Sequence, residues 1–292
     1  MSLRKPSRAS APATPSPTPR TFRLALAQMP VLGGQRARNR ATAVARIAAA
    51  AKAGAQVVLL PEAADLGWTY PPARRLAEPV PGGAFCRALR QAAKRHGVYV
   101  CCGLTERAGR HVFNAAVLIS PEGKVILHHR KLNELEIGHG VYDQGDRLGV
   151  VATPLGTFGL MICADGYTDR QYVTRTLGLM GADVVLSPSA WAVPPTWDND
   201  RTPYGGDWRR NYAAVARRFR LWVAGCSNVG RVRGGAWDGH RCIGCSLVVG
   251  PDGRAAVQGR FGEEADELLF VDVAPVPRPA RGAGWARLKS RD

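Results

Sequence analysis

Residues 157–165 read Thr157-Phe158-Gly159-Leu160-Met161-Ile162-Cys163-Ala164-Asp165. This nearly continuous apolar run followed by a cysteine is typical of a buried strand that stops at a reactive side chain. The chain continues into a predicted helix over residues 169–180, and 183–186 read as the next buried strand. A strand, a helix and a second apolar strand in succession indicate a covered sheet of the α/β class.

The same alternation extends in both directions from this segment. The remaining predicted helices cover 36–53, 83–96 and 207–219. Predicted strands occur wherever apolar residues run continuously or alternate, at 22–28, 56–60, 98–102, 112–120, 124–129, 221–226, 245–250, 255–258 and 268–273. Turns at 121–123 and 251–253 predict hairpins. The sequence therefore predicts a layered α/β protein with one domain at 21–274.

Three polar side chains follow three of these strands. Glu62 comes after an apolar strand, Lys131 after the return strand of the hairpin, and Cys163 after the segment quoted above. Ligands in layered α/β folds lie beyond the carboxyl ends of strands, so we expect the three to converge. The predicted helix after Cys163 would also favour its thiolate. A thiol, a carboxylate base and an ammonium together suit covalent acyl transfer.

Each residue alone also fits an ordinary structural role. Glu62 could form a cap or a salt bridge, Lys131 could lie on the surface, and Cys163 could be a core thiol. Composition and periodicity leave these alternatives open. The sequence around the three residues decides between them.

The blocks around these residues resemble the nitrilase, or carbon–nitrogen hydrolase, superfamily. The matching blocks contain Glu62, Lys131 and Cys163 in the family's order and at its separations. Further matching pieces are 113–116, 145–146, 181–186, 227–230 and 251–253. The resemblance covers about residues 21–274, and the occurrence of these blocks in the family's order makes it specific.

The resemblance implies a single-domain, four-layer αββα sandwich that pairs into a homodimer, or a higher homo-oligomer, through helices near the nucleophile. It implies that no metal or organic cofactor is needed. It assigns Glu62 as general base, Lys131 as oxyanion-stabilising lysine and Cys163 as nucleophile. The Ala164 N–H would complete the oxyanion site. Many members add a second glutamate, for which Glu134 is favoured over Glu136.

The residues after the nucleophile narrow the expected chemistry. Nitrilases proper carry Trp-Glu there, whereas this chain has Ala164-Asp165-Gly166. The Cys-x-Asp-Gly pattern looks more like the aliphatic-amidase branch. The sequence thus favours hydrolysis of a small-molecule amide or carbamoyl group through a thioester, with release of ammonia. The alternatives are acyl transfer to an amine acceptor, nitrile hydrolysis, and a non-catalytic basic binding protein.

Several further residues are candidates for the substrate pocket. Trp191 lies in the loop at 188–208 with two more tryptophans and three aspartates, Tyr70 follows the base block, and Glu136 and His139 follow the lysine. One interpretation is a pocket for a substrate that has an apolar or aromatic part and a cationic group. The other is that the tryptophans pack the loop and the acids pair with nearby arginines.

Composition bounds the remaining function classes. The 292 residues carry a net charge of +17, and 46% are hydrophobic, which suffices for a core. Residues 1–20 form a Pro/Ala/Ser-rich segment expected to be a disordered leader, and 275–292 form a basic tail. The charge alone is a weak argument for nucleic-acid binding, because no motif accompanies it.

Membrane spans, targeting signals and cysteine spacing bear on where the protein acts and on whether it binds a metal. No apolar stretch reaches the roughly 20 residues that a membrane-spanning helix needs, and no secretory signal is evident. The seven cysteines suit neither a disulfide framework nor a zinc site. We therefore expect a cytoplasmic protein without a metal.

Overall fold

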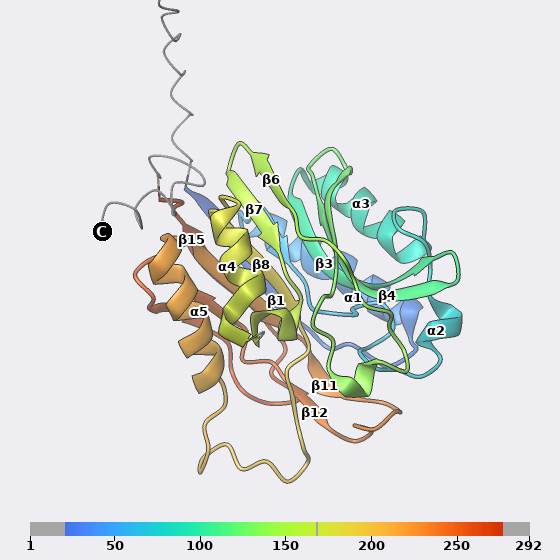
Figure 1. Cartoon of the computed structure of the whole chain (residues 1–292). Coiled ribbons are helices and arrows are strands. Elements are labelled where there is room, and N and C mark those ends of the chain that lie inside the picture. Colours follow the sequence, from blue (N-terminus) through green and yellow to red (C-terminus); the bar gives the residue numbers. More distant parts are fainter. Residues whose placement is uncertain (1–20, 168, 277–292) are drawn as a thin grey trace, which may run out of the picture.

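The structure is a computed structural model that describes residues 21–167 and 169–276. The predicted leader at 1–20 and the tail from 277 onward lie outside the described residues, so their predictions stay untested. Within the described part, two six-stranded sheets stack face to face (Figure 1).

The first sheet carries the base and lysine segments. Its three central parallel strands are separated in the sequence by crossovers that contain helices α1 (Arg36–Lys52) and α3 (Ala84–His96). A meander then extends the sheet toward β5. The strand order is β15 (Glu267–Val273), β1 (Phe22–Gln28), β2 (Val57–Leu59), β3 (Tyr99–Ala108), β4 (His111–Ile119) and β5 (Val125–Arg130).

The second sheet carries the nucleophile segment. Helices α4 (Tyr172–Leu179) and α5 (Gly206–Phe219) pack together on its outer side (Figure 1). Its strand order is β14 (Ala255–Gln258), β13 (Leu247–Val249), β10 (Trp222–Ser227), β8 (Val184–Ser189), β7 (Gly156–Leu160) and β6 (Val150–Thr153). The short strands β11 (Val229–Arg231), β12 (Arg241–Ile243) and β9 (Ala192–Val193) form a third sheet.

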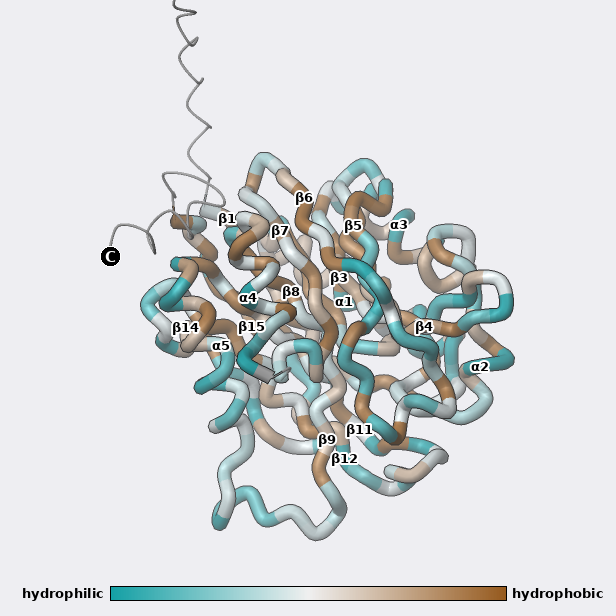
Figure 2. Tube along the Cα trace, viewed as in Figure 1, coloured by the Kyte–Doolittle hydropathy of each residue, from teal (hydrophilic) through white to brown (hydrophobic). Residues whose placement is uncertain are grey.

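Side-chain alternation along β2 explains the layering. Val57 and Leu59 join the apolar cluster that includes residues of both sheets, whereas Val58 and Leu60 join the cluster beneath α1 and α3. Successive residues of a strand point to opposite faces, so a continuously apolar strand is buried on both sides. Figure 2 shows the same apolar interior strands beneath more polar helices. The predicted αββα sandwich is confirmed.

Two local predictions need correction. The helix expected over 169–180 is shorter, because the chain first makes 3₁₀ turns at Cys163–Tyr167 and Asp169–Gln171. The strand expected at 98–102 continues to Ala108 and forms an unpredicted hairpin with β4. Its polar residues Thr105 and Glu106 are nevertheless buried, and their polarity concealed the strand.

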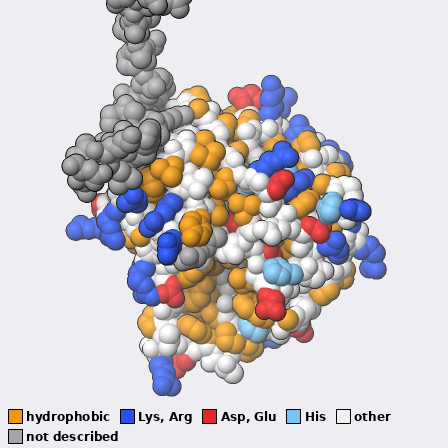
Figure 3. Space-filling model, in the orientation of Figure 1, with side chains coloured by type: hydrophobic (Ala, Val, Ile, Leu, Met, Phe, Trp, Pro, Cys, Tyr) orange, Lys and Arg blue, Asp and Glu red, His pale blue; other side chains and the backbone are white. Residues whose placement is uncertain are grey.

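The outer surface bears on the expected partners. Basic side chains are spread over the face in Figure 3 rather than gathered into one patch. Large exposed apolar side chains occur on and beside α4, namely Tyr172, Leu179 and Met180. The predicted dimer would use helices of this kind, and it stays a prediction. Among the described residues, no helix has the length and apolar character to cross a bilayer.

Candidate active site

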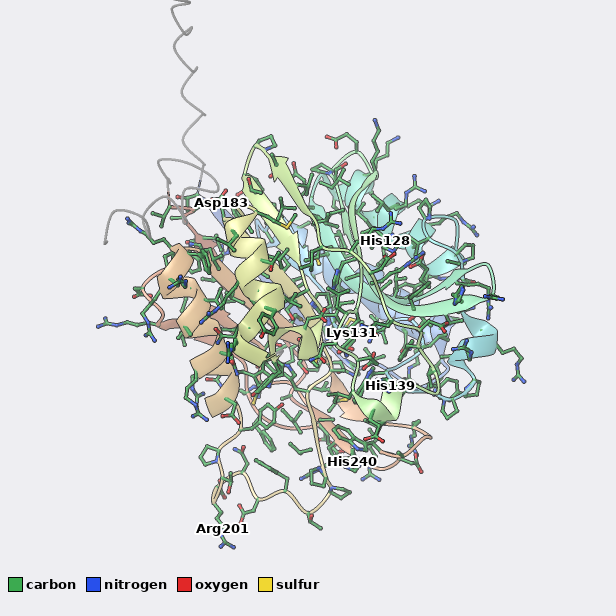
Figure 4. All side chains as sticks on the ribbon, viewed as in Figure 1. His128, Lys131, His139, Asp183, Arg201 and His240 are labelled. Carbon is green, nitrogen blue, oxygen red and sulfur yellow. The ribbon has the colours of Figure 1, made fainter. Side chains whose placement is uncertain are left out.

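Lys131 lies at the centre of a buried cluster of charges. Its Nζ donates hydrogen bonds to Glu62 Oε1 at 2.8 Å and to Glu134 Oε1 at 2.9 Å. The side chains of Lys131, Glu62 and Glu134 are at most 5% exposed. Glu62 follows β2 and Lys131 follows β5, so one sheet supplies both. Figure 4 shows Lys131 near the middle of the molecule, with His139 on an adjacent loop.

Cys163 reaches this cluster from the other sheet. It follows β7 and starts the 3₁₀ turn, with a positive φ of 42° and a backbone N–H that donates to Ser187 Oγ at 3.2 Å. A positive φ is unusual for a residue with a side chain and persists only where the surroundings enforce it. The Glu62 N–H donates to the Ser189 carbonyl at 3.2 Å and thereby links the base turn to the same sheet.

One buried carboxylate joins the lysine and cysteine segments. Asp165 Oδ1 accepts from the N–H groups of Leu132 and Asn133 at 3.0 and 2.8 Å. Its Oδ2 accepts from the Ile162 N–H at 2.9 Å and lies 2.8 Å from His129 Nε2. These contacts outweigh the effect of burial and hold the pKa of Asp165 below its usual range. The segment around Lys131 is thus fixed against the turn that presents Cys163.

Burial controls the electrostatics of the three central groups. It favours the neutral amine of Lys131, but the charges of Glu62 and Glu134 outweigh it and raise the lysine's pKa well above its ordinary value. Burial also raises the pKa of Glu62, and the Lys131 charge offsets this only in part. The result is a charged lysine beside a carboxylate that binds a proton more readily than a free glutamate does.

The thiolate expected at Cys163 is not supported. Burial, with the Glu62 charge adding to it, raises the pKa of the Cys163 thiol well above its ordinary value. The residue begins a short 3₁₀ turn rather than an α-helix, so the expected helix N-terminal charge is absent there. The resting group is therefore a thiol, and a base must remove its proton.

Comparisons with known proteins identify the family of this chain. The sequence model of the family described as carbon-nitrogen hydrolase matches residues 23–277. The chain belongs to the carbon–nitrogen hydrolase family. Its enzymes cleave C–N bonds, and the chain's relatives include both amidases and nitrilases.

Two relatives and one solved structure illustrate the similarity. A nitrilase from Pyrococcus abyssi is 30% identical over 81% of this chain and 83% of its own length. An (R)-stereoselective amidase from a Pseudomonas species is 28% identical over 68% of this chain and 66% of its own. The fold matches a mutant amidase from Nesterenkonia sp. AN1 with a TM-score of 0.71 and 21% identity, covering 92% of this chain and 96% of that one.

In this carbon–nitrogen hydrolase, the three candidate residues that follow Lys131 differ in whether they contact it. Glu134 contacts Lys131, whereas Glu136 is exposed at the start of the 3₁₀ turn Glu136–Gly138. His139 is also exposed, with Nε2 3.2 Å from the Glu134 carbonyl oxygen. Only Glu134 of these three is therefore in the charge cluster.

The remaining pocket candidates lie at different depths. Ala164 is buried in the 3₁₀ turn, and its carbonyl accepts from Asn133 Nδ2 at 2.6 Å. Trp191 is 2% exposed and stacks on Trp208 with ring centroids 4.7 Å apart. Tyr70 is half-buried against the loop of Gly33 and Gly34, apart from the charge cluster.

An aromatic cavity adjoins the nucleophile turn through Tyr167. It measures about 300 Å³, and Trp197, Tyr204 and Trp208 supply much of its wall. Two of the three aspartates of this loop have partners, since Asp198 caps a local turn and Asp207 pairs with Arg210. These contacts favour the interpretation that the acids are structural and give no support to a cation-binding pocket.

Sequence reasoning assigned no role to Asn114, His129 or Asp165. Each is buried and contacts the segments that carry Glu62, Lys131 or Cys163. No specific role was predicted for Trp68 either. Its Nε1 donates a hydrogen bond to Glu134 Oε1 at 3.3 Å. Their placement directly within or beside the matching blocks was the available signal, but block membership does not reveal a partner.

The described residues contain no group of three or more His, Cys, Asp or Glu side chains that could hold a metal ion. The seven cysteines are free and buried.

Gly103 allows β3 to approach the turn that carries Glu62. A Cβ on Gly103 would lie 2.5 Å from Glu62 Cα and 2.9 Å from the Pro61 carbonyl oxygen. We expect Gly103→Ala to displace this turn, to lower kcat by about 10-fold or more, and to destabilise the protein by about 1–3 kcal/mol. Steady-state kinetics and thermal unfolding measure the two effects.

Gly82→Ala is the matched control for this substitution. A Cβ at Gly82 would meet only Pro79 Cγ, at 4.0 Å, among the atoms within that distance. Its kinetics and unfolding should stay close to wild type. Equal behaviour of the two alanine variants would show that close approach at Gly103 does not set the position of Glu62.

Proposed function

We propose that this carbon–nitrogen hydrolase cleaves the C–N bond of a small-molecule amide or carbamoyl compound through a thioester on Cys163 and releases ammonia. One observation carries the proposal. The buried Lys131 ammonium donates hydrogen bonds to two buried carboxylates, at the point where the turn of Cys163 meets the lysine segment. This arrangement suits acyl transfer, which needs a nucleophile, a base and a cation for the oxyanion.

The acylation step uses all three groups. Glu62 takes the proton of the Cys163 thiol as sulfur attacks the carbonyl carbon. Lys131, together with the Ala164 N–H, stabilises the negative charge that develops on the carbonyl oxygen. The C–N bond then breaks, and Glu62 returns its proton to the leaving nitrogen, which departs as ammonia. The raised pKa of Glu62 suits this exchange near neutral pH.

Water completes the cycle. The oxygen of a water molecule attacks the thioester carbon while Glu62 takes a proton from that water. Lys131 again stabilises the oxyanion. The C–S bond breaks, the carboxylic acid leaves, and the sulfur recovers its proton from Glu62. Glu134 has the role of the second glutamate, because it accepts a second hydrogen bond from Lys131 Nζ.

We assign the proposed substrate contacts according to how deeply each candidate residue is buried. Trp191 and the aromatic cavity beside it would receive the apolar part of the substrate. The outer approach to the site would hold Tyr70, Glu136 and His139, because they lie outside the charge cluster. A solved Nesterenkonia amidase with the acetamide moiety of fluoroacetamide added at its active-site cysteine supports covalent chemistry in this fold.

Ammonia release tests the proposal. The purified protein is incubated with a panel of aliphatic and aromatic amides, carbamoyl compounds and nitriles, with Cys163→Ala as the blank. We expect release from at least one amide or carbamoyl compound and none from the blank. Release from nitriles alone, or equal release by both proteins, would contradict the proposal.

Acyl transfer is the second candidate, because the same thioester can react with an amine in place of water. Adding hydroxylamine to the active reactions separates the two. Hydrolysis as the main activity predicts rapid acid formation without hydroxylamine. An enzyme built for transfer would release product only when the acceptor is present.

A further inference from the structure

Asn114 lies between the two carboxylates of the charge cluster. Its Nδ2 donates to Glu62 Oε1 at 2.6 Å and to Glu134 Oε2 at 2.9 Å. The residue is 1% exposed and belongs to β4. The backbone carbonyl of Asn114 accepts a hydrogen bond from the backbone N–H of Lys131 at 2.8 Å. A single residue therefore contacts the proposed base, the second glutamate and the lysine.

The charge balance of the cluster gives this contact its importance. Two carboxylates share one ammonium, so the three groups together carry one net negative charge when both glutamates are ionised. Neighbouring buried carboxylates tend to retain a proton between them. Two N–H bonds from an amide favour the ionised form of both, because each bond is made to a carboxylate oxygen. The reverse orientation would place Asn114 Oδ1 against two anions.

The hydrogen bonds also distinguish the two oxygens of Glu62. Oε1 accepts from both Lys131 Nζ and Asn114 Nδ2. Oε2 is buried and has no hydrogen-bond partner among the described residues. An oxygen that already accepts two strong bonds is a poor proton acceptor, whereas a buried oxygen without a donor is a good one.

We propose that Asn114 is a positioning residue that keeps Glu62 ionised in the resting enzyme and leaves Glu62 Oε2 as the atom that receives the thiol proton. The inference rests on the proposed function for the identity of that proton. The ionisation of Glu62 is testable without any substrate. No bond is made or broken at Asn114 itself.

Other charged and titratable groups act on Glu62 as well. Lys131 and Glu134 come from the segment after β5, and Cys163 comes from the nucleophile turn. The Glu62 charge adds to burial in raising the pKa of Tyr142 and of Cys242, so both lie within its reach, and the buried Asp65 shares the turn of Glu62. Substituting Asn114 leaves all of these groups in place, so a changed pH response reports the lost amide.

The test is the pH dependence of two properties of Asn114→Ala. The first is the rate at which iodoacetamide alkylates Cys163, followed by intact mass with Cys163→Ala as the blank. Without the amide, the pKa of Glu62 rises. The acid limb of the pH profile, where the alkylation rate falls as the pH is lowered, should therefore move to higher pH by about one unit. The rate at pH 6 should fall about 10-fold.

The second property is thermal stability at pH 8 and pH 5.5. Asn114→Ala should lower the unfolding midpoint more at pH 8 than at pH 5.5. The reason is that a carboxyl whose folded pKa is raised favours the folded state at low pH and loses that advantage as pH rises through this pKa. This measurement is independent of turnover, so it still reports if the ammonia panel contradicts the proposed function.

Asn133→Ala is the matched control. Asn133 is also an amide beside the site, but its Nδ2 donates to the Ala164 carbonyl and to neither glutamate. The pH at which the alkylation rate of Asn133→Ala begins to fall should match that of the wild type, whatever the absolute rate. Should Asn114→Ala fail to fold, Asn114→Ser retains one O–H donor and should give a smaller shift in the same direction. An unmoved acid limb with an equal loss of stability at both pH values would overturn the proposal.

Discussion

Replacing Cys163 with alanine should lower ammonia release by about four orders of magnitude or more. The expected loss is this large because the thiol forms the covalent bond on which both half-reactions depend. Neither Glu62 nor Lys131 can replace it, since one is the proton carrier and the other a cation. The measurement is the rate of ammonia release on the best substrate of the panel, at protein concentrations high enough to detect the residual rate.

The fold should survive this change. Cys163 contributes one buried sulfur, and its backbone contacts to Ser187 and through Asp165 are retained by alanine. The unfolding midpoint should therefore stay within a few degrees of wild type. Cys86→Ala is the matched control, because Cys86 is equally buried but lies on α3 and outside the charge cluster. Loss of activity in both variants would point to packing, and activity retained by Cys163→Ala would place the nucleophile elsewhere.

The sequence predicted the layers because strand burial leaves a clear pattern. The run from Val57 to Leu60 is apolar without interruption, and it lies between helices on one side and the second sheet on the other. The same logic located the ends of the strands, where Glu62, Lys131 and Cys163 occur. Their convergence followed from topology, and the family blocks supplied their proposed roles.

Contacts within the site were less predictable. Asp165 and His129 are 36 residues apart, and the hydrogen bond between them depends on how the two sheets stack. Asn114 lies in a run of small apolar residues, so nothing local indicates that it touches two carboxylates. The high pKa of the Cys163 thiol likewise follows from burial in the assembled fold rather than from the residues next to it.

Lys131→Met should reduce turnover by about 100- to 1,000-fold, because the oxyanion loses its charged partner. The same substitution should also destabilise the fold. Methionine matches the length of lysine but leaves Glu62 and Glu134 buried without their cation, at an expected cost of about 3–5 kcal/mol in unfolding free energy near pH 8.

The pH dependence identifies the origin of this cost. Without the ammonium, the folded-state pKa values of the two glutamates rise, so the deficit should shrink as pH falls from 8 toward 5. Adding Glu134→Gln to Lys131→Met removes one of the repelling charges, and it should restore part of the stability without restoring turnover. Lys94→Met, at an exposed lysine on α3, should change stability by less than about 0.5 kcal/mol. A deficit that persists unchanged at low pH and in the double variant would mean that lost packing, rather than two uncompensated carboxylates, destabilises the protein.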